Sequence, residues 1–153
     1  MPYQFTLYDA FSGIPPHEKV KVVHFLCGQR SDATRQHALE AVEYALKLKP
    51  SFGGFVLAAK KDGQLAGVIV ANRTGMEGSN PKNLFVFVVL DKLLEQDEAQ
   101  ARCMLQRALQ HADGDVAMHI EPDNPALQLY QKLGFQAQYL ELRFPQQKTT
   151  AVA

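Results

Sequence analysis

The stretch Asp123–Phe135 reads DNPALQLYQKLGF and carries the signals of a short, capped helix. Asp123 or Asn124 can accept the hydrogen bonds of a first turn, and the proline that follows fits inside that turn. Gly134 is typical of the residue that ends a helix, because glycine adopts the left-handed conformation without strain. The stretch therefore predicts a helix over Pro125–Leu133.

Tyr130 is the aromatic residue of this predicted helix. It lies three residues after Leu127 and four after Ala126, so the three side chains share one face of the helix. Two interpretations follow. Tyr130 either packs with its hydroxyl at the surface, which composition alone favours, or it presents a functional phenol.

The rest of the chain alternates between strand and helix patterns. Apolar, partly β-branched runs predict strands over Phe5–Tyr8, Phe55–Ala59, Leu65–Ala71, Leu84–Leu90, Val116–Ile120 and Gln138–Phe144. Helical patterns run from Pro15 to Gly28, from the capping residues Ser31 and Asp32 to Lys49, and from Asp91 or Leu94 to His111.

Two local signals organise the predicted sheet. Asp62 and Gly63 supply the positive φ angles of a tight hairpin turn between the strands over Phe55–Ala59 and Leu65–Ala71. Leu84–Leu90 is apolar at every position, which is typical of a central strand that is buried on both faces.

The elements together predict an α/β (α+β) fold with a mixed, mostly antiparallel sheet and helices on both faces. The chain has 153 residues and no linker, repeat or charge block. This organisation predicts a single domain over residues 1–145 and a flexible tail over residues 146–153.

Charge and composition exclude several classes of function. Sixteen basic and sixteen acidic residues cancel, so we expect neither a nucleic-acid nor a membrane partner. The longest apolar run is far shorter than the roughly 20 residues that span a bilayer. Cys27 and Cys103 lack metal-ligand spacing, so we expect no metal site. Two free thiols, with no secretion signal, indicate the cytoplasm.

The stretch Asp123–Phe135 resembles the last helix of the GNAT family of acyl-CoA-dependent N-acetyltransferases, whose signature reads roughly Asn-x-x-Ala-x-x-x-Tyr-x-Lys-x-Gly-Phe. The residues that match in register are Ala126, Tyr130, Lys132, Gly134 and Phe135. Asp123 stands at the asparagine position, with Asn124 beside it. The order of elements over residues 5–144 is also similar to that family. The resemblance implies the GNAT-like acyl-CoA N-acyltransferase fold, with two splayed central strands.

In that family acetyl-CoA lies in the gap between the splayed strands, which the resemblance places at Leu84–Leu90 and Val116–Ile120. It implies that backbone groups near Val88 and Leu90 bind the pantetheine arm and polarise the thioester carbonyl. It also implies that Tyr130 is the general acid that protonates the departing thiolate, a suitable role for a phenol.

The acceptor amine must be neutral to attack, so the reaction needs a base or a chain of water molecules. His119 and Glu121, at the end of the second splayed strand, are the candidates. His119 alternates with Met118 and Ile120 and so faces the other side of the sheet from them. A lone histidine on a strand is more often structural, so both interpretations of His119 stay open.

The family binds the coenzyme pyrophosphate in a loop of pattern Gln/Arg-x-x-Gly-x-Gly/Ala. The matching segment here is QDEAQA, over residues 96–101. The resemblance places the coenzyme contacts at Gln96, Ala99, Gln100, Ala101 and Arg102, together with Asn124 from the last helix.

This loop departs from the family pattern. Ala99 replaces the first glycine, and Glu95, Asp97 and Glu98 bring three carboxylates to a place where pyrophosphate would bind. Residues 93–112 are all compatible with a helix, so a helix that begins early would fill the loop. Both features predict weakened coenzyme binding.

Two hypotheses follow. The first is an N-acetyltransferase that moves the acetyl group of acetyl-CoA directly to the primary amine of a small molecule or peptide, with Tyr130 as the acid. The second is a binding or regulatory module of the same fold that has weakened or lost acetyl-CoA binding through the acidic loop. Only one strand is predicted after the last helix, where the family commonly has two, so a homodimer that covers this edge is a further prediction.

Overall fold

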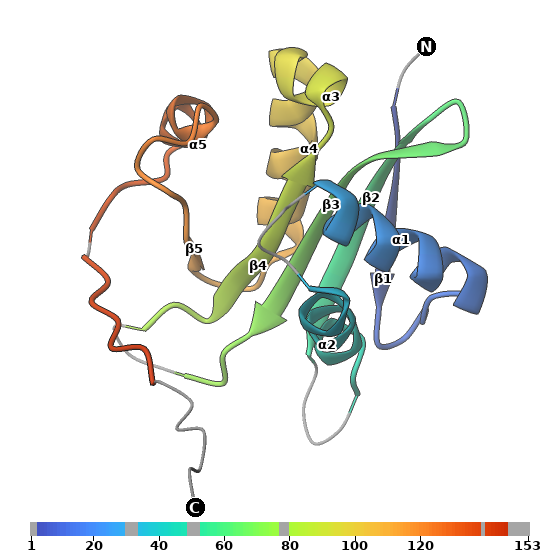
Figure 1. Cartoon of the computed structure of the whole chain (residues 1–153), viewed down its shortest axis with the longest axis horizontal. Helices are drawn as coiled ribbons and strands as arrows, with labels where there is room; N and C mark the ends of the chain where they lie inside the picture. Colours follow the sequence, from blue (N-terminus) through green and yellow to red (C-terminus); the bar gives the residue numbers. More distant parts are fainter. Residues whose placement is uncertain (1–2, 30–33, 49–52, 77–79, 139, 147–153) are drawn as a thin grey trace, which may run out of the picture.

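A five-stranded sheet in the order β1-β2-β3-β4-β5 is the middle layer of this computed structural model (Figure 1). The structure describes residues 3–29, 34–48, 53–76, 80–138 and 140–146. Each of the first four strands runs antiparallel to its neighbour, and β5 runs parallel to β4. The strands are β1 (Gln4–Asp9), β2 (Gly54–Lys61), β3 (Gln64–Arg73), β4 (Asn83–Leu90) and β5 (Val116–Met118).

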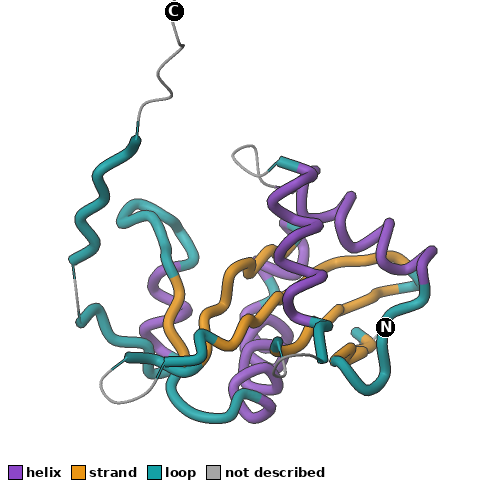
Figure 2. The backbone as a smooth tube through the Cα atoms, turned by 90° about the horizontal axis from the view of Figure 1, so that it is seen from below, coloured by secondary structure: helices purple, strands orange, loops and turns teal. Residues whose placement is uncertain are grey.

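Helices cover both faces of the sheet, as Figure 2 shows from below. One face packs against α1 (Pro16–Gln29) and α2 (Arg35–Ala45). The other packs against α3 (Lys92–Gln96), α4 (Glu98–His111) and α5 (Leu127–Lys132). The predicted mixed, mostly antiparallel sheet between two helical layers is therefore confirmed. None of the helices in the described part of the chain is long and apolar enough to span a membrane.

The hairpin between β2 and β3 forms at the predicted residues. Asp62 has φ 53° and Gly63 has φ 79°, the pair of left-handed residues that a two-residue hairpin turn requires. Since β2 ends at residue 61 and β3 begins at residue 64, these two residues are the whole turn.

β4 is the fourth of the five strands, an interior strand, and it is not buried on both faces as predicted. Its odd-numbered side chains are buried and its even-numbered ones are half-buried. A bulge changes the faces within the strand: Val70 pairs with Phe87 and Ala71 with Phe85, which leaves Val86 without a register partner on β3. Phe85 consequently packs in the α4 layer, whereas Phe87 packs in the α1 and α2 layer.

Three predicted helices differ from the observed ones. The helix expected up to His111 is two helices, because Asp97 interrupts it with ψ 83° and caps α4. α2 is capped by Thr34, whose Oγ1 accepts a hydrogen bond from the His37 N–H. The predicted caps Ser31 and Asp32 lie outside the described residues. α5 begins at Leu127, two residues after the expected start.

The predicted strand over Gln138–Phe144 is wrong. Residues 135–138 and 140–146 contain no strand, and Leu140, Leu142 and Phe144 are exposed. β5 also ends earlier than expected, at Met118. An alternating pattern forms a strand only where a neighbouring strand pairs with it, and no described strand lies along this segment. Of the predicted tail, residues 147–153 lie outside the described part.

Candidate functional site

The sheet opens between β4 and β5. These two strands pair from Asn83 and Val116 only as far as Phe85 and Met118. On its other side β4 stays paired with β3 up to Leu90. Within the described chain, the last five residues of β4 therefore have a neighbouring strand on one side only. The opening begins at the bulge, where the ladder is already irregular.

Val88 and Leu90 lie on this open part of β4, as the sequence predicts for them. Their side chains pack against the core beneath α4 and α5, the core that also contains Tyr130. The side chains of Val88, Leu90 and Tyr130 thus lie on the same face of the sheet.

α5 holds Tyr130 in the core. Only 5% of the residue is exposed, and its ring meets Phe135 edge-on, with centroids 6.2 Å apart. Gly134 ends the helix with φ 109°, and the Phe135 N–H donates to the Tyr130 carbonyl at 3.1 Å. At the other end the Asn124 Oδ1 accepts from the Ala126 N–H at 2.8 Å, in the turn before the helix. Asn124 is therefore a turn residue, and neither it nor Asp123 caps α5 itself.

The Tyr130 hydroxyl is held neutral. Burial, and to a smaller extent the nearby Glu95 carboxylate, raise the pKa of Tyr130 to about 12, because both disfavour the phenolate. Among the described residues, no hydrogen bond engages this hydroxyl. A phenol of this kind stays protonated throughout the physiological range and can donate a hydrogen bond.

Asp97 occupies the amides that begin α4. Its Oδ1 accepts from the Gln100 N–H at 3.3 Å, and its carbonyl accepts from the Ala101 N–H at 2.9 Å. The segment between α3 and α4 is thus a single residue, so helical structure occupies most of the loop but is interrupted at Asp97. Gln96 and Ala99 are exposed on either side, and Ala101 is fully buried.

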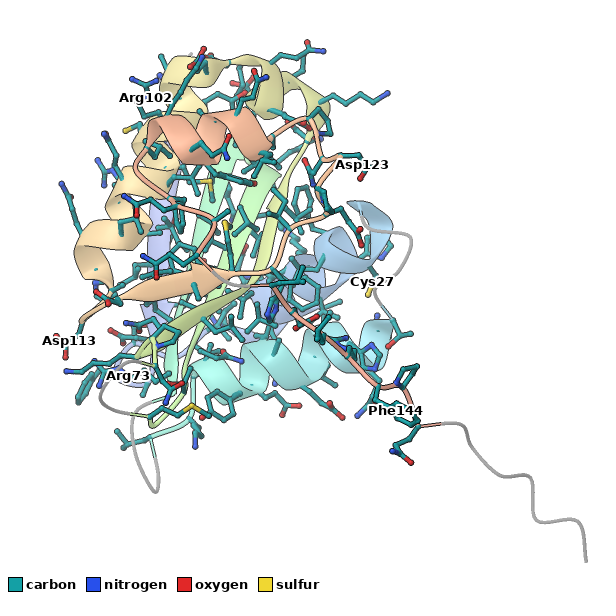
Figure 3. The ribbon with its side chains drawn as sticks, turned by 90° about the vertical axis from the view of Figure 1, so that its left-hand side faces the viewer. Cys27, Arg73, Arg102, Asp113, Asp123 and Phe144 are labelled. Atoms are coloured by element: carbon teal, nitrogen blue, oxygen red, sulfur yellow. The ribbon has the colours of Figure 1, made fainter. Side chains whose placement is uncertain are left out.

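The Glu98 carboxylate connects α4 with α5. Its Oε1 lies 3.2 Å from an Arg102 guanidinium nitrogen and 3.3 Å from the Lys132 Nζ. The Arg102 Nε is buried and has no hydrogen-bond partner in the described chain. Figure 3 shows Arg102 on α4, with α5 in front of that helix.

A pocket of about 570 Å³ lies where α3, α4 and the N-terminal turn of α5 meet. Its charged lining consists of two lysines and two glutamates. The lining residues are Lys92, Glu95, Gln96, Glu98, Pro125, Ala126, Gln128, Leu129 and Lys132. The pocket therefore adjoins both the predicted phosphate-binding segment and the helix that carries Tyr130.

The structure does not bring the two candidate bases to Tyr130. His119 and Glu121 lie after the end of β5, in an exposed segment. The His119 Nε2 lies 3.1 Å from the Glu141 Oε1, so its partner is a carboxylate of the C-terminal segment. In the described chain, no hydrogen bond or ion pair joins His119 or Glu121 to Tyr130. β5 ends one residue before His119, but the expected alternation holds, because Met118 and Ile120 pack against the core and His119 is exposed.

Sequence reasoning missed two contacts of the site. The ion pair of Glu98 with Arg102 has the helical i,i+4 spacing, so the sequence carried a signal for it. The ion pair of Glu98 with Lys132 spans 34 residues and has no local signature. The second contact explains how the motif lysine of α5 is held against α4.

Comparisons with known proteins identify the fold through structural similarity and not through sequence. No protein-family model matches the chain, and no curated protein matches it in sequence. Among solved structures it is similar to an aminoglycoside 6′-N-acetyltransferase from Acinetobacter baumannii, with 16% identity and a TM-score of 0.63 over 94% of this chain and 99% of that one. An aminoglycoside N-acetyltransferase in complex with CoA has 12% identity and a TM-score of 0.65 over 95% and 97%.

A structure described as a transcriptional regulator from Bacillus halodurans is also similar, with 15% identity and a TM-score of 0.58 over 93% of this chain and 99% of that one. The agreement covers almost the whole length of each protein. The chain therefore has the fold of the GNAT N-acetyltransferases.

Proposed function

We propose that this protein is an N-acetyltransferase that transfers the acetyl group of acetyl-CoA directly to a primary amine. The observation that carries the proposal is a neutral, buried tyrosine without a hydrogen-bond partner in the described chain, on the helix beside an opened sheet. The shared fold with acetyltransferases, one of them in complex with CoA, supports the same function.

The residues of the opening fit the acyl end of the coenzyme. Near Val88 and Leu90, β4 has no described neighbouring strand on its β5 side. Its backbone N–H and C=O groups there can form hydrogen bonds with an extended pantetheine arm, as they would with a neighbouring strand. An N–H of this edge can also polarise the thioester carbonyl.

The phosphate groups of the coenzyme would be bound by cationic side chains more than by backbone amides. Lys92 and Lys132 line the pocket beside α3 and α4, and their ammonium groups are donors for an anion. Gln96 and the exposed Ala99 amide remain accessible, whereas Asp97 occupies the Gln100 and Ala101 amides. We expect the coenzyme to bind weakly, with Asp97 as the main obstacle.

Tyr130 would supply the proton of the reaction. The amine nitrogen forms a bond to the thioester carbon, and the carbon–sulfur bond breaks. The sulfur takes the Tyr130 proton, and the phenolate then takes the surplus proton of the new amide nitrogen. Because its pKa of about 12 disfavours a lasting phenolate, the two proton transfers must be closely coupled.

The acceptor is a small-molecule amine under this proposal, since several similar structures are aminoglycoside acetyltransferases and one is in complex with sisomicin. His119 and Glu121 remain the candidates for the base. Their exposed segment follows β5, so an acceptor that enters the opening from this side would pass them. The two free cysteines support a reducing compartment, the cytoplasm, as its location.

A binding or regulatory module is the second candidate. The observation that favours it is the acidic junction of α3 and α4, where the Asp97 carboxylate already caps the helix that a phosphate would cap. A module of this kind would keep the fold without acetyl transfer.

Calorimetry with the purified, CoA-free protein distinguishes the acetyltransferase from the binding or regulatory module. Acetyl-CoA and desulfo-CoA are titrated separately. The enzyme proposal expects micromolar to submillimolar binding of acetyl-CoA, and thiol release when a panel of primary amines is added. Absence of binding at millimolar coenzyme would contradict it and favour the module.

A further inference from the structure

A second cavity, the edge cavity, lies at the side of the sheet that is farthest from the opening. Its volume is about 310 Å³, at the lower end of the roughly 300–1,000 Å³ of small-molecule sites. Figure 1 shows β1 and β5 at opposite edges of the sheet, in keeping with the strand order. The lining residues are Phe5, Leu7, Leu57, Arg107, Gln110 and His111. Because the two ends of α4 are about 20 Å apart, the edge cavity is separate from the pocket where α3, α4 and α5 meet.

The floor of the edge cavity is apolar. Phe5 and Leu7 lie two residues apart on β1, so both side chains point to the face of the sheet that carries α4, beside Leu57 of β2. Leu57 is buried, whereas Phe5 and Leu7 are half-buried, because β1 is the edge strand of the described sheet. The floor therefore offers apolar surface that a ligand can cover.

One face of α4 supplies the polar wall. Arg107, Gln110 and His111 have the spacing i, i+3 and i+4, so their side chains are neighbours. The Arg107 guanidinium carbon lies 5.1 Å from the centre of the Phe5 ring, which is within the range of a cation–π contact. The His111 ring meets Phe55 edge-on, with centroids 4.7 Å apart. Two aromatic rings thus hold these side chains at the cavity.

The edge cavity contains a cation without a counter-ion. In the described part of the chain, no ion pair or hydrogen bond engages the guanidinium group of Arg107, and no acidic residue lines the cavity. Asp9, the carboxylate of β1, instead accepts hydrogen bonds from the Phe11 and Ser12 N–H groups, at 2.9 and 3.0 Å. A permanent positive charge therefore stands above an apolar floor, with the N–H donors of Gln110 and His111 beside it.

We propose that the edge cavity binds a small monocarboxylate with an apolar body, as a second ligand site of this protein. The guanidinium group of Arg107 can pair with the carboxylate through two parallel N–H donors, and Gln110 and His111 can donate to its remaining lone pairs. The apolar body of the ligand covers Phe5 and Leu7. No group of the proposed acetyl transfer lines this cavity, so the inference does not depend on that function.

An NMR titration of the isotope-labelled full-length protein with 3-phenylpropionate tests the site. The probe carries one carboxylate and one ring, and 3-phenylpropionamide keeps its shape without the charge. We expect the acid to shift the backbone signals of Arg107, Gln110 and His111, with a dissociation constant in the millimolar range or below. The neutral analogue should bind about tenfold more weakly. Absence of saturation at tens of millimolar acid, or equal binding of the analogue, would overturn the proposal. Shifts confined to Lys92 and Lys132 would also overturn it, because they would place the acid in the other pocket.

Arg107→Gln tests the cation in the same titration. Glutamine keeps N–H donors but removes the positive charge, so the affinity for 3-phenylpropionate should fall about tenfold. Arg107 is exposed, and the rest of the spectrum reports whether the variant keeps the fold. The matched control, Arg35→Gln, removes the same charge from an exposed residue of α2, on the opposite face of the sheet, and should bind the probe as the wild type does. Unchanged affinity in Arg107→Gln, or an equal loss in both variants, would contradict the proposal.

Discussion

The Asp97 carboxylate accepts a hydrogen bond at 3.3 Å from the backbone N–H of Gln100, the donor that a phosphate oxygen would use at the start of α4. Acidic residues stabilise the first turn of a helix, because they complement its dipole. The same residue that makes α4 begin early therefore competes with the coenzyme of the proposed reaction. The Asp97 carboxylate therefore stabilises the start of α4 and, under the proposed function, lowers the affinity for the coenzyme.

Asp97→Asn should tighten coenzyme binding. Asparagine keeps an oxygen that can cap the helix, but it removes a negative charge a few ångströms from the phosphates. In a water-like environment such a charge is worth about 1 kcal/mol, so we expect roughly a fivefold lower dissociation constant by calorimetry.

Asp113→Asn is the matched control for this change. It removes the same charge from an exposed residue whose nearest cation is Arg73, 3.8 Å away. Figure 3 shows both residues at the opposite end of the sheet from Arg102. The control should leave coenzyme affinity unchanged. An equal gain in both variants would mean that only net charge matters, and no gain at Asp97 would reject the competition.

Tyr130 should make folding stability depend on alkaline pH. Its pKa is raised from an ordinary value of 10 to about 12 in the folded protein. The contribution of neutral Tyr130 to the free energy of unfolding is therefore complete below pH 10 and is lost as the pH rises toward 12. By linkage it amounts to roughly 2–3 kcal/mol, mostly from burial.

Urea unfolding at a series of pH values between 9 and 12 would reveal this dependence. Relative to the wild type, Tyr130→Phe should show a shallower fall of the free energy of unfolding over that range. Parallel curves for the two proteins would show that Tyr130 is not the residue responsible.

Gly67 should be required for the close approach of α3 and α4 to β3. A Cβ atom at this position would lie 2.9 Å from a Leu94 methyl carbon and 3.1 Å from the Met104 sulfur. These are ends of flexible side chains, so Gly67→Ala should destabilise the protein by roughly 1–3 kcal/mol rather than prevent folding.

Gly28→Ala provides the contrasting variant. Gly28 lies in α1, and a Cβ there would meet no atom within 4 Å. Since alanine is the better helix former, this variant should be stabilised by about 0.5–1 kcal/mol. Denaturant midpoints would measure both changes. Destabilisation of both variants, or of neither, would contradict the packing argument.

Much of the fold could be predicted from the sequence because its signals are local. Asp62 and Gly63 fix the hairpin, and the apolar run over Leu84–Leu90 identifies an interior strand, β4. The last strand could not be predicted correctly, since the pattern of residues 140–144 indicates a strand but not whether a neighbour pairs with it. The break at Asp97 was missed for a related reason: each residue favours a helix, and only the cap separates α3 from α4.

The candidate site was predictable in part. The spacing of Ala126, Tyr130 and Gly134 indicated α5, and the structure places Tyr130 in the core beside the opened sheet. The contacts of Glu98 with Lys132 and of His119 with Glu141 connect distant parts of the chain. Such contacts depend on tertiary packing, so helix and strand periodicity could not reveal them.

Steady-state and binding measurements on Tyr130→Phe test the central claim most directly. Thiol release from acetyl-CoA in the presence of an accepted amine gives kcat, and calorimetry gives the coenzyme dissociation constant. Tyr3→Phe, another buried tyrosine of the same core, is the control. We expect Tyr130→Phe to lower kcat by about 10²-fold, the usual size of a general-acid contribution, and to leave coenzyme binding nearly intact. Unchanged turnover in Tyr130→Phe, or an equal loss in Tyr3→Phe, would contradict the claim.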